Sequence, residues 1–236
     1  MNYQFSLVLP IQNHDEIIEL VVKNINKVLK QAKIDYEILM VENGSIDKTL
    51  QVLKKLARQN KRNKVLVSKP GYAEAIVYGL NRAKGKYVCY MDADGQCDEK
   101  VLLKVIKAIQ KPGVDLIKVF RANRESVLRK NISLNFNLLA NLMFVLKAKD
   151  INASPTCFVR TNLKKLDIQA KDSFIDTELM IKANHLKWKI VRIPMKNFNR
   201  AGGESTVKPG LILEFLKNMF EWKFGNKFSQ WVKTLK

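Results

Sequence analysis

Two carboxylates, two residues apart, follow an apolar segment near the middle of the chain. Residues 87–91 have the composition of a buried strand, and Asp92 and Asp94 come directly after them, followed by Gly95 and Gln96. Side chains at positions i and i+2 of an extended backbone point to the same side. Two carboxylates held in this way repel each other unless a cation lies between them, and Mg²⁺ and Mn²⁺ prefer such oxygen ligands. The pattern therefore indicates a divalent metal site, with a surface turn as the alternative because Asp and Gly are common turn residues.

Alternating strand and helix patterns in the first 120 residues would position this pair. The expected strands are 5–11, 36–41, 64–68, 86–91 and 114–120, and the expected helices, from apolar residues at helical spacing, are 15–32, 46–59, 72–83 and 98–110. This order predicts an α/β fold with a mostly parallel sheet flanked by helices. Ligands of such sheets bind beyond the carboxyl ends of the strands. Polar clusters stand at four such ends, namely residues 10–13, 42–45 and 92–96, and Arg121.

The pattern changes after residue 121. A long helix is expected over 126–147, then a strand at 157–160, a helix at 174–186, a strand at 188–197 and a terminal helix from about residue 210. No internal repeat, low-complexity tract or linker interrupts the sequence. We therefore expect one α/β domain over residues 1–210, followed by an amphipathic helical tail over residues 211–236.

Composition narrows the cellular setting. The chain has 236 residues and a net charge of +20, which favours anionic partners such as nucleotides, phospholipid head groups or nucleic acid. Its three scattered cysteines form no metal motif and no disulfide framework, which suggests a reducing compartment. No signal sequence is recognisable at the N-terminus. The longest apolar stretch, 136–146, is too short to span a bilayer.

The motifs, taken in order, resemble family 2 glycosyltransferases of the GT-A fold, and most closely the dolichyl- and polyprenyl-phosphate sugar synthases. The resemblance covers nearly the whole chain, and each motif alone is weak while their shared order is specific. Its residues are 8–10 with Asn13, 37–45 with Asp47 and Thr49, 71–83 with Gly85, 91–94 with Gln96, 176–179, and Arg200, Gly203 and Ser205. It implies a GT-A sheet, mixed but mostly parallel, and an inverting transfer of a sugar from a nucleotide-sugar donor.

On the donor side, the resemblance implies a metal and nucleotide-sugar site. Asp92 and Asp94 match the family's D-x-D metal motif, with Gln96 assisting, so Mg²⁺ or Mn²⁺ is the implied cofactor. The implied nucleotide-sugar positions are Pro10, Gln12, His14, Glu42, Asp92, Ala93, Asp94, Gln96, Arg200 and Lys208. Gln12 and His14 replace the family's usual aromatic residue and glutamate, so the donor stays open between a GDP- and a UDP-sugar. The plainer alternatives are that Pro10 only ends a strand, that Glu42 is solvated and that His14 is a polar loop residue.

On the acceptor side, the resemblance implies a positively charged wall that grips a phosphate. Arg129 and Ser133 are spaced i, i+4 and share a helix face, and they match this wall together with Arg121 and Ser205. The arginine fork fits phosphate oxygens. Arg200, Ser205 and Lys208 lie on a glycine-rich segment that could close as a lid. The alternatives are an exposed basic helix face and a plain connecting loop.

Asp176 and Glu178 match a D-x-E motif that the family places near the reacting centre, so both are expected as catalytic residues. A hydroxyl acceptor needs a base to take its proton. A phosphate monoester is already largely ionised near neutral pH and needs positive charge instead. The arginines at 121, 129 and 200 therefore favour a lipid-phosphate acceptor, while transfer to a sugar hydroxyl with Asp176 as base is the alternative.

The tail is lysine-rich and has apolar residues at near-helical spacing from Ile212 to Leu235. Such a helix suits an anionic membrane surface, although packing on the core explains the pattern equally well. We expect a peripheral protein at the cytoplasmic face of a membrane, with a membrane protein as a further candidate partner. A basic nucleic-acid-binding protein without catalysis is the remaining alternative, but no arginine-rich arm supports it, so we expect no nucleic-acid partner.

Overall fold

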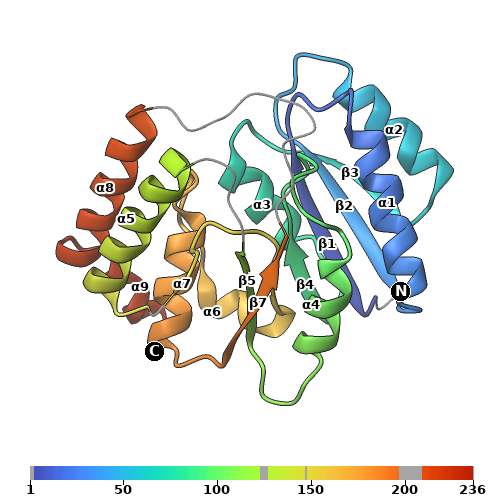
Figure 1. Cartoon of the computed structure of the whole chain (residues 1–236). Coiled ribbons are helices and arrows are strands. Elements are labelled where there is room, and N and C mark those ends of the chain that lie inside the picture. The colour runs from blue at the N-terminus through green and yellow to red at the C-terminus, as the bar shows by residue number, and fades with distance from the viewer. Residues whose placement is uncertain (1–2, 123–126, 147, 197–208, 236) are drawn as a thin grey trace.

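The computed structural model describes residues 3–122, 127–146, 148–196 and 209–235, and the side chains of 127–132 and 209–212 are not described. The strands are β1 (Phe5–Ile11), β2 (Tyr36–Glu42), β3 (Asn63–Val67), β4 (Tyr87–Tyr90), β5 (Leu116–Arg121), β6 (Thr156–Val159) and β7 (Ile190–Met195). The helices are α1 (Ile18–Gln31), α2 (Thr49–Gln59), α3 (Tyr72–Leu80), α4 (Val101–Ile109), α5 (Val127–Phe144), α6 (Leu163–Leu166), α7 (Ile175–His185), α8 (Pro209–Phe224) and α9 (Lys227–Thr234). Each predicted strand and helix has a counterpart whose ends differ by a few residues, except that the predicted terminal helix is divided into α8 and α9 (Figure 1).

The strands form one sheet of seven in the order β3-β2-β1-β4-β6-β5-β7. β6 pairs antiparallel with β4 and β5, and the other pairs are parallel. The prediction of a mixed, mostly parallel sheet is therefore confirmed. The carboxyl ends of β1, β2, β4 and β5 meet at one edge of this sheet, so the four polar clusters that follow these strands lie at that edge.

Helices cover both faces of the sheet, and the strands are accordingly apolar on both sides. In β1, Phe5, Leu7 and Leu9 belong to the core under α1, α2 and α4, whereas Val8 faces the opposite core, which α3 and α7 cover. A Cβ atom at Gly79 of α3 would lie 2.4 Å from Val8 Cγ1, so only glycine allows this close approach of helix to sheet. The two cores hold β4 firmly, and the residues that follow it start from a rigid strand.

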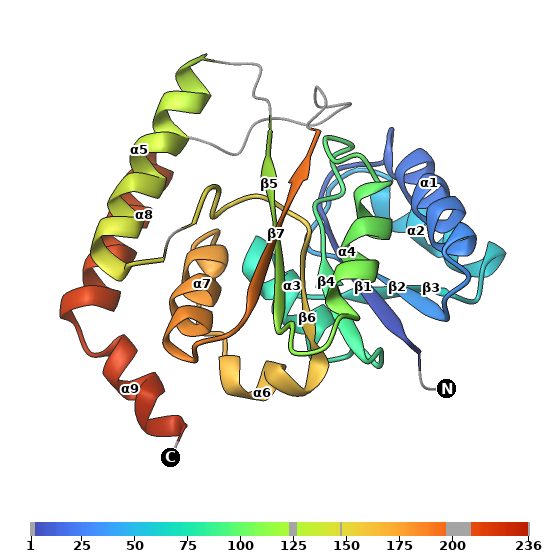
Figure 2. The same cartoon turned by 60° about the horizontal axis from the view of Figure 1, so that its bottom comes forward.

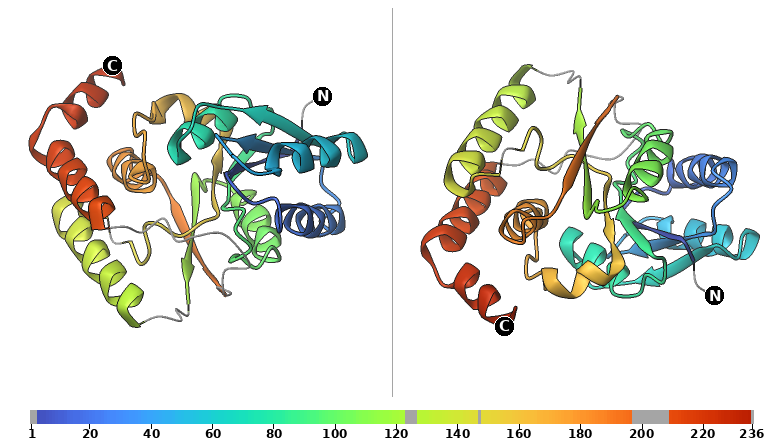
Figure 3. Two further views of the ribbon diagram at one scale, coloured as in Figure 1. Left: turned by 90° about the horizontal axis from the view of Figure 1, so that it is seen from above. Right: turned by 90° about the horizontal axis from the view of Figure 1, so that it is seen from below.

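The C-terminal region differs from the expected single helix, because the chain turns at Gly225 and Asn226 between α8 and α9. Helices α5 and α8 lie side by side as an outer layer, with α7 between them and the sheet (Figures 2 and 3). Met219, Trp222 and Trp231 of this region are buried. Across the described residues, no helix combines the length and the apolar character that crossing a membrane would need.

The structure adds one helical segment that the sequence patterns did not predict. A 3-10 turn over Arg160–Asn162 leads into the short helix α6. Asp167, which ends α6, has a left-handed backbone with φ of 38°. The segment is too short to show a helical period, and this explains why it was missed.

Candidate active site

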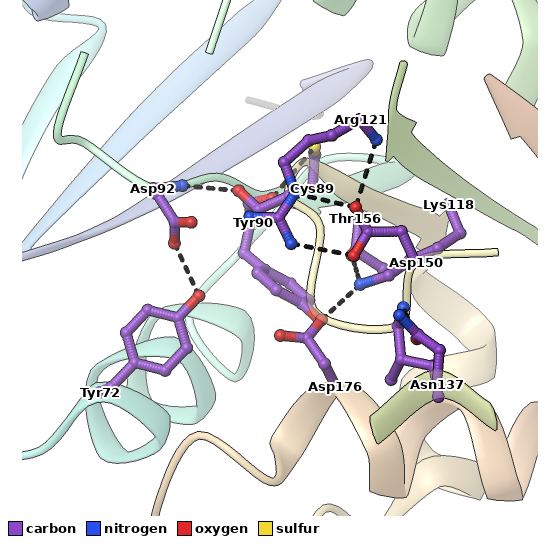
Figure 4. A network of polar contacts seen from close by, with 12 residues as sticks. Tyr72, Cys89, Tyr90, Asp92, Lys118, Arg121, Asn137, Asp150, Thr156 and Asp176 are labelled. Atoms are coloured by element: carbon purple, nitrogen blue, oxygen red, sulfur yellow. Dashed lines mark hydrogen bonds and ion pairs between the residues drawn. The ribbon is translucent and has the colours of Figure 1, made fainter. Parts of the chain in front are cut away.

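Asp92 and Asp94 lie directly beyond β4, with Ala93 buried between them. The backbone N–H of Asp92 donates to Ser154 Oγ at 2.8 Å, which ties this segment to the loop before β6. Asp94 Oδ1 accepts the N–H of Gln96 at 3.1 Å, so the turn after the pair is closed by its own carboxylate. The hydroxyl of Tyr72, at the start of α3, donates to Asp92 Oδ1 at 2.7 Å (Figure 4). Both carboxylates are thus held in place by neighbouring backbone and side chains.

The charge of Asp92 is destabilised by its surroundings. Burial, and after it the neighbouring Asp94 carboxylate, raises the pKa of Asp92 to about 6, while the Tyr72 hydroxyl and the charge of Arg121 act in the opposite direction. A divalent cation would remove this repulsion, and its preferred ligands are carboxylate oxygens. Asp92 and Asp94 therefore fit a Mg²⁺ or Mn²⁺ ion. No group of three or more His, Cys, Asp or Glu side chains suited to a metal occurs in the described part of the chain.

Arg121 ends β5 and forms the positive side of the site. Its Nε and Nη2 atoms donate to the two oxygens of Asp150 at 2.8 and 2.9 Å, and its backbone N–H donates to the same carboxylate. Burial opposes its charge, but Asp150 and the more distant charges of Asp92 and Asp176 outweigh burial, so the pKa of Arg121 is raised. The guanidinium is therefore charged, held in one orientation, and within electrostatic range of Asp92.

Helix α5 braces the loop that carries Asp150. The N–H of Ile151 donates to Asn137 Oδ1 at 2.9 Å, and Asn137 Nδ2 donates to the backbone oxygen of Ser133 at 2.7 Å. Ser133 thus lies on the helix that braces this loop, and its contact with an acceptor stays a prediction. Arg129 is one turn earlier in α5, but its side chain lies outside the described residues, as do Arg200, Ser205 and Lys208.

A buried polar network lies beneath the site (Figure 4). Lys118, in the middle of β5, donates to Asp176 Oδ1 at 2.5 Å and to Thr156 Oγ1 at 2.8 Å. The hydroxyl of Tyr90 donates to the same Asp176 oxygen at 2.7 Å. A carboxylate that is buried and already paired with an ammonium is poorly suited to take a proton from an acceptor. The geometry therefore favours a positioning role for Asp176 over the role of base.

Glu178, in the first turn of α7, is equally enclosed. Its two oxygens accept the N–H groups of Gln169 and Ala170 at 2.8 and 2.6 Å and the ammonium of Lys182 at 2.5 Å. It has no exposed surface. These contacts make Glu178 a clamp for the loop before α7, and they give no support to the expectation that it acts at the reacting centre.

The loops after β1 and β2 are locked together. Asn13, whose backbone is left-handed, donates its N–H to Ser45 Oγ at 3.1 Å and accepts the Ile46 N–H at 2.9 Å. Glu42 is buried, and its Oε1 accepts the N–H groups of Gly44 and Ser45, so the alternative of a solvated Glu42 is wrong.

The predicted nucleotide positions at residues 10–14 lie on this joined pair of loops. Pro10 is part of β1, and Gln12 Nε2 donates weakly to Gly44 O at 3.4 Å. His14 donates its backbone N–H to Thr49 Oγ1 at 2.8 Å, and its Nδ1 lies 2.5 Å from Gln12 O. These contacts place both side chains at the carboxyl edge of the sheet and leave their part in nucleotide binding a prediction.

Sequence reasoning missed several groups that hold the site. Tyr72, Asp150 and Ser154 contact Asp92 or Arg121 from distant segments, and nothing in their local sequence marks them. Lys118 did carry a signal, because a charged residue among the apolar residues of β5 must have a buried partner.

Comparison with known proteins agrees with this geometry. The family model described as glycosyl transferase family 2 matches residues 6–165. An undecaprenyl-phosphate 4-deoxy-4-formamido-L-arabinose transferase of Photorhabdus laumondii is 26% identical over 204 residues, which are 85% of this chain and 62% of that protein. The corresponding protein of Pseudomonas fluorescens is 26% identical over 216 residues, with 89% and 62% covered. The chain thus spans less than two thirds of the length of these curated relatives.

Solved structures share the fold. Glucosyl-3-phosphoglycerate synthase from Mycobacterium tuberculosis, in complex with Mn²⁺, UDP and glucosyl-3-phosphoglycerate, has a TM-score of 0.71 and 19% identity, with 94% of this chain and 80% of that chain covered. The same enzyme with Mg²⁺ and UDP has a TM-score of 0.70 and 18% identity, with 94% and 79% covered. At this identity the likeness establishes the fold, which is of the GT-A type.

Proposed function

The chain belongs to glycosyl transferase family 2, and from this premise we propose that it transfers a sugar from a nucleotide-sugar donor to a polyprenyl-phosphate acceptor with the help of Mg²⁺ or Mn²⁺. The observation that carries the proposal is the pair Asp92 and Asp94 beside the clamped guanidinium of Arg121, at the carboxyl edge of the sheet. One wall of this site suits a metal-bound diphosphate. The other suits an anionic acceptor.

The donor would bind across the locked loops after β1 and β2. Pro10, Gln12, His14 and Glu42 would face the nucleoside, and Asp92 and Asp94 would hold the metal, with Gln96 nearby. The bound metal would supply Lewis-acid stabilisation of the leaving nucleoside diphosphate. The metal and UDP complexes of the structural neighbour support this assignment, as does the mutual repulsion of the two carboxylates. Arg200 and Lys208 would contribute further positive charge to the diphosphate.

The acceptor phosphate would bind beside Arg121, with Arg129, Ser133 and Ser205 as further contacts. Asp150 orients Arg121 before any ligand binds. Binding of the phosphate therefore does not include the loss of conformational entropy that ordering this side chain would require. A phosphate oxygen would form the bond to the anomeric carbon while the bond from that carbon to the diphosphate breaks, and the electron pair would leave on the diphosphate. Because the acceptor is already ionised, no base is needed. The curated relatives' names, which specify undecaprenyl-phosphate, support this acceptor class.

Transfer to a sugar hydroxyl is the weaker candidate. That reaction requires a free base, and Asp176, which we expected in this role, is buried against Lys118 and Tyr90.

Donor binding gives the first test. UDP- and GDP-sugars should raise the melting temperature of the protein only when Mn²⁺ or Mg²⁺ is present. Asp94→Asn should abolish this stabilisation while the protein stays folded. Asp98→Asn is the matched control, because Asp98 is a nearby carboxylate that accepts the backbone N–H of Lys100 in the turn before α4. Full turnover in excess chelator, or unchanged donor binding by Asp94→Asn, would refute the metal role.

The acceptor gives the second test. Radiolabelled sugar should pass to polyprenyl phosphate and not to the corresponding polyprenol, because the alcohol lacks the charge that Arg121 recognises. Arg129→Ala should weaken acceptor use and leave donor binding nearly unchanged. Efficient transfer to the alcohol would favour the hydroxyl mechanism instead.

A further inference from the structure

Helices α5 and α8 are apolar on two opposite faces, and the protein covers only one of them. On α5 the inward face includes Ala140, which is buried, while Leu134, Leu138 and Leu142, spaced by four residues, are 52%, 58% and 71% exposed. On α8 the inward face includes Met219 and Trp222. The opposite face carries Leu213, Phe220 and Phe224, which are 71%, 56% and 74% exposed.

These six residues form one surface, which we call the outer stripe: Leu134, Leu138, Leu142, Leu213, Phe220 and Phe224. The two helices are joined by the edge-to-face contact of Phe136 and Phe215, with ring centroids 5.0 Å apart. Both lie on the outside of the molecule in every view (Figures 2 and 3). Most of the strongly exposed large apolar side chains in the described residues belong to this stripe. Scattered exposed apolar residues are ordinary, but a row of them on adjacent helices indicates a binding surface.

Two observations indicate what covers the stripe. It continues from the acceptor side of the site, because α5 begins shortly after Arg121 and its Asn137 braces the Asp150 loop that orients this arginine. The chain as a whole carries a net charge of +20. Lys217 and Lys223 are exposed on α8 beside the stripe, together with the acidic Glu214 and Glu221, and Lys223 Nζ reaches across to Met143 O on α5 at 2.6 Å. Leucine and phenylalanine bordered by lysine are typical of helices that lie in the interface of an anionic bilayer.

We infer that the outer stripe is the surface with which this protein lies on an anionic lipid bilayer, with α5 and α8 parallel to the membrane plane. The inference rests on the proposed lipid-phosphate acceptor. A polyprenyl chain stays in the bilayer while its phosphate reacts, so the site must open next to lipid. With α5 on the membrane, the acceptor side of the site is brought to the head-group level. The sequence predicted that the whole tail, residues 211–236, could lie on a membrane. In this inference only the outer face of α8 contacts lipid, because α9 is packed on the core through Trp231.

The test uses neutral substitutions, so that the net charge does not change. Leu142→Gln combined with Phe224→Gln removes two apolar groups from the stripe. Leu20→Gln combined with Val67→Gln is the matched control, because these side chains are 64% and 54% exposed on other elements. Flotation is measured with vesicles of phosphatidylcholine containing about 30% phosphatidylglycerol. The stripe variant should bind at least about tenfold more weakly than the control, in proportion to the apolar area lost, and both should melt like the wild type.

The other possible results of these measurements lead to different conclusions about the stripe. Wild-type protein that does not float with these vesicles, or a stripe variant that floats as well as the control, would overturn the inference. A wild-type dimer in light scattering that the stripe variant converts to monomer, without loss of vesicle binding, would assign the stripe to a second copy instead. Binding of UDP- or GDP-sugar with Mn²⁺ is measured on the same proteins. Normal donor binding without vesicle binding overturns only this inference, whereas vesicle binding without any donor binding overturns only the proposed function.

Discussion

Lys118 Nζ lies 2.5 Å from Asp176 Oδ1, and the two side chains are only 4% and 5% exposed. The pair joins β5, which ends in Arg121, to the first turn of α7. Tyr90 and Thr156, from β4 and β6, complete the hydrogen bonds of the two charges. Three strands and a helix that all reach the site thus share one charged contact, and this contact fixes their relative positions.

Asp176→Asn should therefore cost stability and not only activity. The change leaves the Lys118 charge buried without its counter-ion, and breaking a buried pair in this way typically costs about 3–5 kcal/mol. Replacing both partners by apolar residues, as in Lys118→Met with Asp176→Leu, should recover most of that loss. Urea unfolding measures each effect, and Glu221→Gln is the control because its pair with Lys227 is exposed. If Asp176→Asn were as stable as the wild type but inactive, the result would instead favour Asp176 as the catalytic base.

Asp92 should make the stability of the metal-free protein depend on pH. Its pKa is raised to about 6 by burial and by Asp94, from about 4 in an unfolded chain. A raised pKa in the folded state means that the carboxyl favours folding below about pH 4, and that this contribution is lost as the pH rises towards 6. Asp92→Asn cannot ionise. It should therefore be more stable than wild type above about pH 6, by on the order of 1–3 kcal/mol, and show little advantage near pH 4.

Unfolding in urea across this pH range, with chelator present, measures the difference. Adding Mn²⁺ with UDP should reverse the order above pH 6, since only the wild type can bind the metal fully. If the free energies of unfolding of the two proteins differed by the same amount at every pH, ionisation of Asp92 would not destabilise the metal-free protein as expected.

The sequence allowed most of the fold and part of the site to be predicted. The strands of the first 120 residues are continuous apolar runs between amphipathic helices. The proposal of Asp92 and Asp94 as a metal pair follows from their spacing beyond one strand end. The direction of β6 was not predictable, because a four-residue strand carries no sign of its partners. Tyr72 and Asp150 were missed because their contacts join residues 20 and 29 positions apart in the chain. Such contacts depend on the folded sheet and not on a local pattern.

Arg121→Lys should impair acceptor use selectively. Lysine keeps the charge but cannot reproduce the two parallel hydrogen bonds to Asp150, so its ammonium would not be held towards the acceptor. We expect the KM for polyprenyl phosphate to rise by about tenfold to a hundredfold, with the Kd for the nucleotide sugar changed little. Arg62→Lys is the control, since Arg62 pairs with Asp35 at the surface. If Arg121→Lys instead bound the nucleotide sugar more weakly, Arg121 would be assigned to donor binding and not to acceptor binding.

Lys182 should anchor the C-terminal helices to the core. Its Nζ lies 5.1 Å from the ring centre of Trp222 in α8 and 5.2 Å from that of Trp231 in α9, and it donates to Leu166 O and Asp167 O at 2.7 Å. Trp231 is fully buried and donates its indole N–H to Lys165 O at 3.0 Å.

Trp231→Ala should therefore destabilise the protein by about 3–5 kcal/mol, as large aromatic truncations in a core do. Ending the chain after Phe224, which removes α9, should do at least as much. Lys233→Ala is the control, because that side chain is exposed and on the same helix. Urea unfolding gives the values, and flotation with anionic vesicles shows whether membrane binding follows α9. If α9 were instead a membrane-bound tail, Trp231→Ala and the chain that ends after Phe224 would both keep the stability of the wild type and would bind vesicles more weakly.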